Sequence, residues 1–397
     1  FPDEILELRP ELLKDGRICP SEPFWLEFIE RKTDEFFTDF PGFAGMVSSA
    51  GSTEGKASRA QGKCGCALCA RTSLEEWYHG IITALHAATA RHGKRLAVRD
   101  FAYKPADHAP LIRAVARAPA EVAFCVKATP HDFYLTFPHN PAIRPMARPL
   151  WVEYDTMGQF HGWGLFPGLV LDDIAHRLGH AAANGAEGVS FRVEWERIND
   201  FWSLDTLNEV NLIAGAALAA GDGADAQAAC QGWLAAHGHP PRAAAPLARV
   251  LLRAAAILRA ALYLDGFVMA DNSMYPRSLQ RAWWGMEVRD ALHTWQPERA
   301  HAMRLPRRRV NALIAAKTAA RDDMAALAAE LRAGEAEFGA ALHARLVAIF
   351  DRFEIYVAGF ALCAEVCVRA RWADPAWADD APAPADGVAF AETIDRL

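Results

Sequence analysis

The sequence of 397 residues lacks three features that mark common classes of protein. No apolar run approaches the ~20 residues that a membrane-spanning helix needs, so we expect no membrane segment. Basic residues are not in excess, because 42 Lys and Arg stand against 49 Asp and Glu, and the net charge is −7. The one dense basic run, RLPRRR at 304–309, is typical of a solvated helix start, so we expect no nucleic-acid partner. The opening FPDEILELRP has no features of a secretion signal, which leaves cytoplasm and periplasm open.

Apolar segments that suit buried strands alternate with segments of helical periodicity over the first half of the chain. The predicted strands are 43–47, 96–102, 122–128, 150–154 and 188–194. Alternation of this kind predicts an α/β fold with a parallel sheet, and a (β/α)8 TIM-type barrel is the form that we expect. These strands are too few to close such a barrel, so we expect the earlier strands to lie upstream of Phe1.

The composition changes after Gly221, where Ala and Leu dominate and the pattern becomes helical. We therefore expect a β/α-barrel catalytic region at 1–222, an all-α C-terminal domain at 223–375 and an extended tail at 376–397. Helices are predicted at 242–265, 277–295, 308–332 and 335–371. The helical domain is also the surface through which a homodimer could form.

Three carboxylates lie at or just beyond the ends of predicted strands. They are Glu54, Asp132 and Glu153, and the basic residues Arg99 and Lys127 belong to the same end of the barrel. Each carboxylate alone is compatible with an N-cap or a salt bridge. Together they suit an inverting glycosidase, in which an acid and a water-activating carboxylate stand roughly 6.5–9.5 Å apart.

Four segments carry a resemblance to a known family. They read FAGMVSSAGSTEG (43–55), LAVRDFAY (96–103), VKATPHDF (126–133) and WVEYDTMGQFHG (151–162). In this order and spacing they resemble the catalytic core of family 67 glycoside hydrolases, the α-glucuronidases that remove (4-O-methyl)glucuronic acid from xylo-oligosaccharides. The similarity runs from about Trp25 to Ala220 and includes NEVNLIAGAALA at 208–219. It implies an exo-acting, inverting hydrolase whose strands are the fourth to the eighth of the barrel.

The resemblance assigns roles to the residues at the strand ends. Glu54 matches the family's general acid, and Asp132 and Glu153 match the pair that activates water. Arg99 and Lys127 match basic residues that line the sugar site, which suits an anionic uronate because cations bind carboxylates well. This chemistry requires no cofactor, and the expected partner is an oligosaccharide.

One position departs from the family, since Ala50 stands where the family has a Lys that lines the sugar pocket. Lys56 or Arg59 in the same loop could replace that Lys, or the substrate could lack the group that it recognises. Two alternatives therefore remain open: a related exo-glycosidase for an uncharged sugar, and a carbohydrate-binding barrel without catalysis.

Further residues near the strand ends are candidates for contact with the sugar. His131 adjoins Asp132, His161 follows the fourth predicted strand, and Trp195 ends the fifth. For each of them, packing in the core is the alternative interpretation. Asn211 also matches a family position, but we expect a helix-packing amide there.

The cysteine cluster Cys64, Cys66 and Cys69 lies in the loop that follows Glu54. A structural zinc site needs four ligands, and His79 or Cys19 could supply the fourth. A metal site, a disulfide and free thiols in a tight loop all remain open. No metal is expected to take part in the catalytic step.

Overall fold

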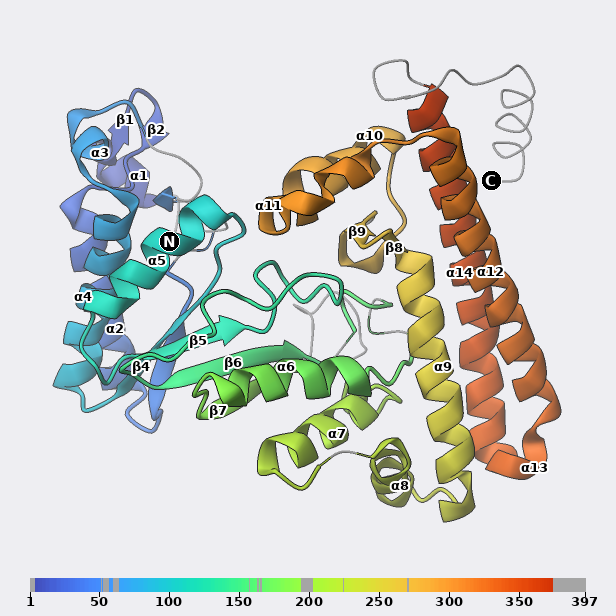
Figure 1. Cartoon of the computed structure of the whole chain (residues 1–397). Coiled ribbons are helices and arrows are strands. Elements are labelled where there is room, and N and C mark those ends of the chain that lie inside the picture. Colours follow the sequence, from blue (N-terminus) through green and yellow to red (C-terminus); the bar gives the residue numbers. More distant parts are fainter. Residues whose placement is uncertain are drawn as a thin grey trace. The chain divides into compact units, whose positions relative to one another are not determined.

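The computed structural model describes residues 4–50, 52, 57–59, 64–156, 158–162, 164, 166–193, 203–223, 225–269 and 271–373 (Figure 1). Contacts divide the chain into two compact units. The first unit comprises Phe1–Asp132, His139–Glu153 and His180–Ser190, and the second comprises Phe133–Pro138, Tyr154–Gly179 and Phe191–Leu397. The domain boundaries expected near residues 222 and 375 were based on the change to a helical sequence pattern and not on contacts, and they stay predictions. The predicted tail lies outside the described residues.

A five-stranded parallel sheet, curled into a half-barrel, organises the α/β part of the chain. Its strands follow the order of the sequence: β3 (Gly45–Ser48), β4 (Arg95–Arg99), β5 (Ala123–Lys127), β6 (Leu150–Asp155) and β7 (Gly188–Arg192). All of the predicted strands are therefore confirmed. In the part of the chain that the structure describes, the sheet does not close into a complete (β/α)8 barrel.

The other strands among the described residues form two short antiparallel hairpins, which were not predicted from the sequence. They are β1 (Leu13–Lys14) with β2 (Arg17–Ile18), and β8 (Tyr263–Leu264) with β9 (Phe267–Val268). In the first hairpin Asp15 and Gly16 turn the chain with positive φ angles of 52° and 70°, a conformation that Asp tolerates and Gly favours.

The helices of the first unit begin at clear sequence signals. They are α1 (Glu4–Leu8), α2 (Pro23–Asp39), α3 (Ala67–Arg71), α4 (Leu74–Arg91) and α5 (Pro105–Arg117). Proline at the first helical position starts α2 and α5, because its missing N–H would have no partner there. A capping box between Ser73 and Glu76 starts α4, whose buried face packs against α2, α5 and β4.

Helices make up most of the second unit. They are α6 (Leu171–Ala183, whose last residues belong to the first unit), α7 (Glu209–Ala220), α8 (Ala226–Ala236), α9 (Ala244–Leu262), α10 (Leu279–Trp284), α11 (Leu292–Trp295), α12 (Arg307–Ala333), α13 (Glu335–Phe338) and α14 (Ala340–Ala373). Each predicted helical range contains a helix, although β8 occupies the end of 242–265 and the range 277–295 is divided between α10 and α11. The start of α12 at Arg307 also confirms that the basic run 304–309 opens a helix.

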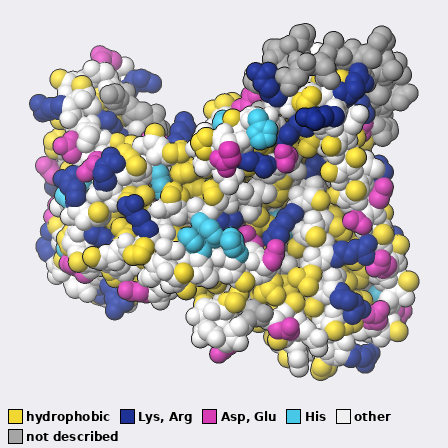
Figure 2. Space-filling view, viewed as in Figure 1, with side chains coloured by type: hydrophobic (Ala, Val, Ile, Leu, Met, Phe, Trp, Pro, Cys, Tyr) yellow, Lys and Arg dark blue, Asp and Glu magenta, His cyan; other side chains and the backbone are white. Residues whose placement is uncertain are grey.

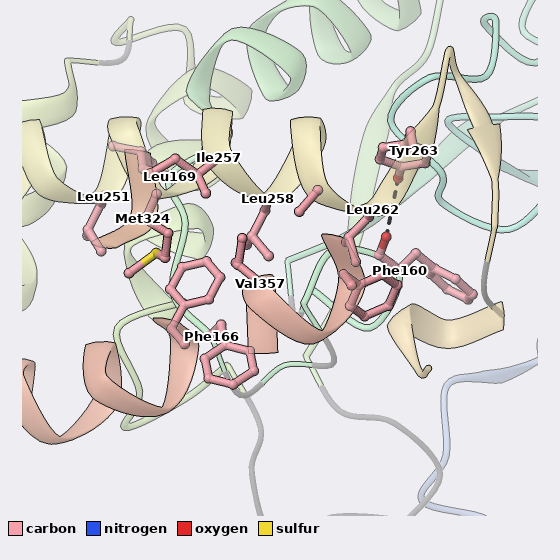
Figure 3. Packing of buried hydrophobic residues seen from close by; sticks show 14 of the residues in the cluster. Phe160, Phe166, Leu169, Leu251, Ile257, Leu258, Leu262, Tyr263, Met324 and Val357 are labelled. Carbon is pink, nitrogen blue, oxygen red and sulfur yellow. Dashed lines mark hydrogen bonds between the residues drawn. The ribbon is translucent and has the colours of Figure 1, made fainter. Parts of the chain in front are cut away.

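The core of the second unit forms where α9 packs against α12 and α14 (Figure 3). Leu251 and Leu258 of α9 point toward Met324 of α12 and Val357 of α14 in the close view. Each is buried, and truncation of such a leucine to alanine typically costs about 2–5 kcal/mol. Tyr263 donates a hydrogen bond to the Phe160 carbonyl (3.2 Å), so the polar end of this ring is satisfied inside the core.

Among the described residues, no helix combines the length and the apolar character that crossing a membrane requires. On the face drawn in Figure 2, Lys and Arg side chains lie interspersed with Asp and Glu. That mixture agrees with the scattered charges of the sequence.

Candidate functional site

Charged side chains gather at the carboxyl ends of β4, β5 and β6 in the first unit. Arg99 and Lys127 are the last residues of their strands, and Glu153 is the register partner of Lys127 across the β5–β6 pair. Alternate residues of a strand point to the same face of a sheet. Arg99, Lys127 and Glu153 therefore share one face, as the sequence predicted from the strand ends.

Arg99 and Glu153 form a bidentate ion pair. The Nε of Arg99 donates to one carboxylate oxygen at 2.5 Å and Nη2 donates to the other at 2.8 Å, while Nη1 lies 3.4 Å from the Ser49 hydroxyl. Burial alone would lower the pKa of Arg99. The hydrogen bonds and negative charge of Glu153 outweigh that effect and raise the pKa, so the guanidinium stays charged.

Lys127 and Asp132 form a second ion pair beside the first. The ammonium donates to the Asp132 carboxylate at 2.8 Å and lies 4.2 Å from the centre of the Phe101 ring. Asp132 has a φ angle of 45°, and the Thr129 hydroxyl donates to its carbonyl at 2.6 Å. The turn after β5 thus directs the Asp132 side chain back toward the lysine of its own strand.

His131 completes this group, with Nε2 3.8 Å from the Asp132 carboxylate and its ring tilted by 39° against that of Tyr103, the two ring centres being 4.6 Å apart. It is buried, as are Lys127 and Asp132. The structure therefore brings together the predicted residues Arg99, Lys127, His131, Asp132 and Glu153 within one unit.

A pocket of about 490 Å³ opens on this face of the sheet. The described residues that line it come from all of the sheet's strands: Val47, Arg99, Cys125, Trp151, Glu153, Gly188, Val189 and Ser190. The Arg99–Glu153 pair thus lies in the pocket wall, whereas Asp132 and Lys127 are not among these lining residues. The pocket presents a carboxylate, a guanidinium and an indole to a ligand, which are groups that bind sugar hydroxyls and sugar faces.

A buried network on the opposite side of β4 was not predicted. Asp100 directly follows Arg99, and its carboxylate accepts hydrogen bonds from His108 Nε2 (2.9 Å), Asn140 Nδ2 (2.7 Å) and the Ala102 amide (3.1 Å). Burial would raise the pKa of Asp100, but the charge of His108 and these hydrogen bonds lower it instead. Burial likewise would lower the pKa of His108, and Asp100 raises it. An Asp at a strand end followed by a His in the next helix was the available signal.

Three of the predicted site residues are not part of this group. Glu54 and Trp195 lie outside the described residues, so their roles stay predictions. His161 belongs to the second unit and is buried in it, where burial first and the charge of Arg259 next lower its pKa to about 3. Asn211 is also in the second unit and bonds the backbone of Gly168 at 2.8 Å, as expected for a packing amide.

The cysteine cluster gains a fourth member from the N-terminal segment. Cys19 lies with Cys64, Cys66 and Cys69 so that all four sulfurs are within 4.8 Å of one another. His79, the other candidate for the fourth position, is not in this group. Of the described residues, these cysteines form the set best suited to hold a soft metal ion.

The strand ends therefore present two carboxylates, each paired with a cation, next to a pocket of sugar-sized volume. No model of a known protein family matches the chain, and no curated protein sequence matches it significantly. A functional assignment thus depends on the chemistry of these residues.

Proposed function

We propose that this chain is an inverting exo-glycosidase of the α-glucuronidase type, which removes a terminal sugar or uronic acid from an oligosaccharide. The Arg99–Glu153 pair in the wall of the pocket is the observation that carries the proposal. A carboxylate at a strand end, held in a fixed orientation by a bidentate arginine, suits a positioned catalytic group. The Asp132–Lys127 pair on the neighbouring strand supplies a second carboxylate.

The pairing of both carboxylates with cations suggests how the chemistry is divided. A cation that donates to a carboxylate stabilises its negative charge, and a charged carboxylate suits activation of water. Glu153 and Asp132 therefore form the basic side. The general acid is Glu54, which follows β3 in the sequence, and it protonates the departing glycosidic oxygen. Water then attacks the opposite face of the sugar, which inverts the anomeric centre.

The sheet itself is proposed to be part of a closed (β/α)8 barrel. Val47 of its first strand, β3, is 56% exposed. A closed barrel would bury an apolar residue on this inward face. Val47 also lines the pocket, so that pocket lies on the face that further strands would enclose. Further strands beside β3 would complete the barrel and narrow the pocket around the substrate.

An uncharged sugar is the second candidate substrate. Ala50, which stands where the related family has a lysine, is buried and brings no charge. The two nitrogens of Arg99 that could grip a uronate side by side are bound to Glu153. For a sugar carboxylate Arg99 would keep only Nη1, which lies 3.4 Å from the Ser49 hydroxyl.

The test is hydrolysis of a panel of substrates by the purified chain: aldouronic xylo-oligosaccharides and neutral aryl α- and β-glycosides. Released sugars are identified by mass spectrometry, and the anomeric proton of the first product is followed by NMR. Glu153→Gln, Asp132→Asn and Glu54→Gln should each lower kcat by about 10²–10⁴-fold, the usual contribution of acid–base catalysis. Glu75→Gln, a half-buried carboxylate at the start of α4 that does not line the pocket, is the matched control and should keep the wild-type rate.

The outcomes separate the candidates. Release of glucuronic acid alone supports the uronate, and release from a neutral glycoside supports the second candidate. Retention of the anomeric configuration would refute inversion. Tight sugar binding without turnover would show a carbohydrate-binding protein, and absence of both binding and turnover over the whole panel would overturn the proposal.

A further inference from the structure

Four cysteine sulfurs form a compact cage in the first unit. Cys64 Sγ lies 3.2 Å from Cys66 Sγ and 3.5 Å from Cys69 Sγ, and Cys19 Sγ lies 3.6 Å from each of the latter two. In a tetrahedral zinc–thiolate site with Zn–S bonds of about 2.3 Å, the sulfurs stand about 3.8 Å apart. The cage therefore has nearly the size that one such ion requires.

The same distances disagree with the other interpretations of the cluster. A disulfide joins its sulfurs at about 2.05 Å, well below each of these sulfur–sulfur distances in the cage. Free thiols could gather in a hydrophobic core, but among the described residues this core consists of Cys19, Cys64 and Cys69, with Cys66 and Leu68 packed against it. Such a group buries too little apolar surface to order two distant chain segments, which is the situation in which small motifs use a metal.

The polar atoms around the cage are arranged as the outer shell of a metal site. The backbone amide of Cys69 lies 3.4 Å from Cys66 Sγ, and the Ser21 hydroxyl lies 3.3 Å from Cys69 Sγ. Arg59 donates to the Cys69 carbonyl at 2.9 Å and so brings a positive charge to the rim of the cage. Donors and positive charge of this kind orient thiolate ligands and offset the negative charge of four thiolates.

The segment that carries Cys19 also makes contacts outside the cage. Trp25 of α2 donates to the Cys19 carbonyl at 2.9 Å, and Trp77 of α4 donates to the Pro20 carbonyl at 2.8 Å. These indole bonds hold the backbone of Cys19 near the start of α4, where Cys69 in α3 also lies. The ligand from the N-terminal segment is therefore held in place by the helices as well as by the sulfurs.

We infer that Cys19, Cys64, Cys66 and Cys69 bind one Zn²⁺ ion in a closed, structural site. All four positions are filled by thiolates, so no position is left for water or substrate, and the ion has no role in catalysis. The ion would tie the segment after the β1–β2 hairpin to the start of α3. The site does not depend on the proposed hydrolase activity.

The test measures metal in the full chain, purified without chelator from cells grown with zinc. Elemental analysis should find one zinc ion per chain, and a mercurial that blocks thiols should release it to a colorimetric indicator. Cys19→Ser and Cys69→Ser should lose the ion. Cys363→Ser, a half-buried cysteine of α14, is the matched control and should keep it.

A second measurement covers variants that fail to fold. Zinc in the wild-type chain is exchanged for Co²⁺, whose absorption reports geometry and thiolate number. Intense bands of a tetrahedral site with four sulfurs support the inference. Fewer sulfurs, bound iron in place of zinc, a disulfide among these cysteines by mass spectrometry, or a full complement of zinc in Cys19→Ser would each overturn it.

Discussion

Replacement of Asp100, a charged residue inside the first unit, should weaken that unit strongly. Its carboxylate is 1% exposed and joins three segments: the end of β4, helix α5 through His108, and the loop after β5 through Asn140. Asp100→Ala removes all of these hydrogen bonds, so that the buried donor groups of His108 and Asn140 lose this acceptor. No other described carboxylate of this unit holds together so many elements from a buried position.

The size of the effect can be worked out from these contacts. Hydrogen bonds to a charged group contribute about 1.5–3 kcal/mol each, and part of that sum is offset because the carboxylate is removed from water. Breaking a buried ion pair by removing one partner costs about 3–5 kcal/mol. We therefore expect Asp100→Ala to lower the free energy of unfolding by about 3–5 kcal/mol, and Tm by roughly 10 °C. Asp100→Asn keeps one acceptor oxygen and should lose about half as much.

Urea unfolding gives the free energy, and hydrogen exchange with mass spectrometry shows whether the loss is confined to peptides of β4 and α5. The control is Glu75→Ala, because Glu75 pairs with Arg113 and Arg117 near the surface, where ion pairs contribute little to stability. If Asp100→Ala lies within 1 kcal/mol of Glu75→Ala (about the limit for exposed pairs), the reasoning about this network is wrong.

The same network predicts a pH dependence. The pKa of His108 is raised by Asp100, so its contribution is complete below about pH 6.5 and is lost as pH rises through the folded value. The pKa of Asp100 is lowered, so its contribution is present above about pH 3.8 and is lost as pH falls through the folded value. The stability difference between wild type and Asp100→Ala should therefore be largest between these limits and shrink above pH 6.5. A difference that grew with pH would contradict the assignment of the charged pair.

Three further changes probe other buried groups. Arg99→Met should lower the free energy of unfolding by about 3–5 kcal/mol, because it leaves the Glu153 charge buried and unpaired. The double variant Arg99→Met/Glu153→Met should recover most of that loss, and simple additivity in a double-mutant cycle measured in urea would contradict this. The pKa of His161 is lowered from 6.5 to about 3, so between these pH values the unfolded chain binds a proton that the folded chain does not. The free energy of unfolding of the second unit should therefore fall by about 1.4 kcal/mol per pH unit as pH falls from 6.5 to 3. His161→Gln should remove that slope, and an unchanged slope would refute the reasoning. Lys317 donates to three backbone carbonyls at the end of α9, so Lys317→Met should destabilise that helix end by about 2 kcal/mol, as measured by hydrogen exchange. The control Arg321→Met, on the surface of α12, should leave the exchange of α9 unchanged.

The strands could be predicted from the sequence because their signals are local. Each is a short apolar run between polar or helical segments, and each is a strand of the parallel sheet in the structure. The charged residues at the strand ends followed from the same pattern, since parallel strands bring their carboxyl ends to one edge. The predicted groups Arg99, Lys127, Asp132 and Glu153 therefore lie together.

Pairings between distant residues could not be predicted in the same way. Cys19 and His79 were equal candidates for the fourth ligand, because spacing along the chain does not show which of them reaches the cluster. A tertiary contact decided it, through the indole bonds of Trp25 and Trp77. Likewise, nothing in the composition marks the points where the chain passes between the two units, since these crossings fall inside strands, loops and helix α6.

The buried network also connects the fold to the candidate site. Asn140 Nδ2 bonds Asp100 and lies 3.4 Å from the Thr129 carbonyl, and the Thr129 hydroxyl holds the Asp132 carbonyl at 2.6 Å. Asp100 thereby fixes the turn that presents Asp132, although it faces away from the pocket. Because Arg99 and Glu153 bind each other directly, they do not depend on this connection. A change at Asp100 should therefore impair the proposed role of Asp132 in activating water more than that of Glu153. This difference would identify Asp100 as a positioning residue.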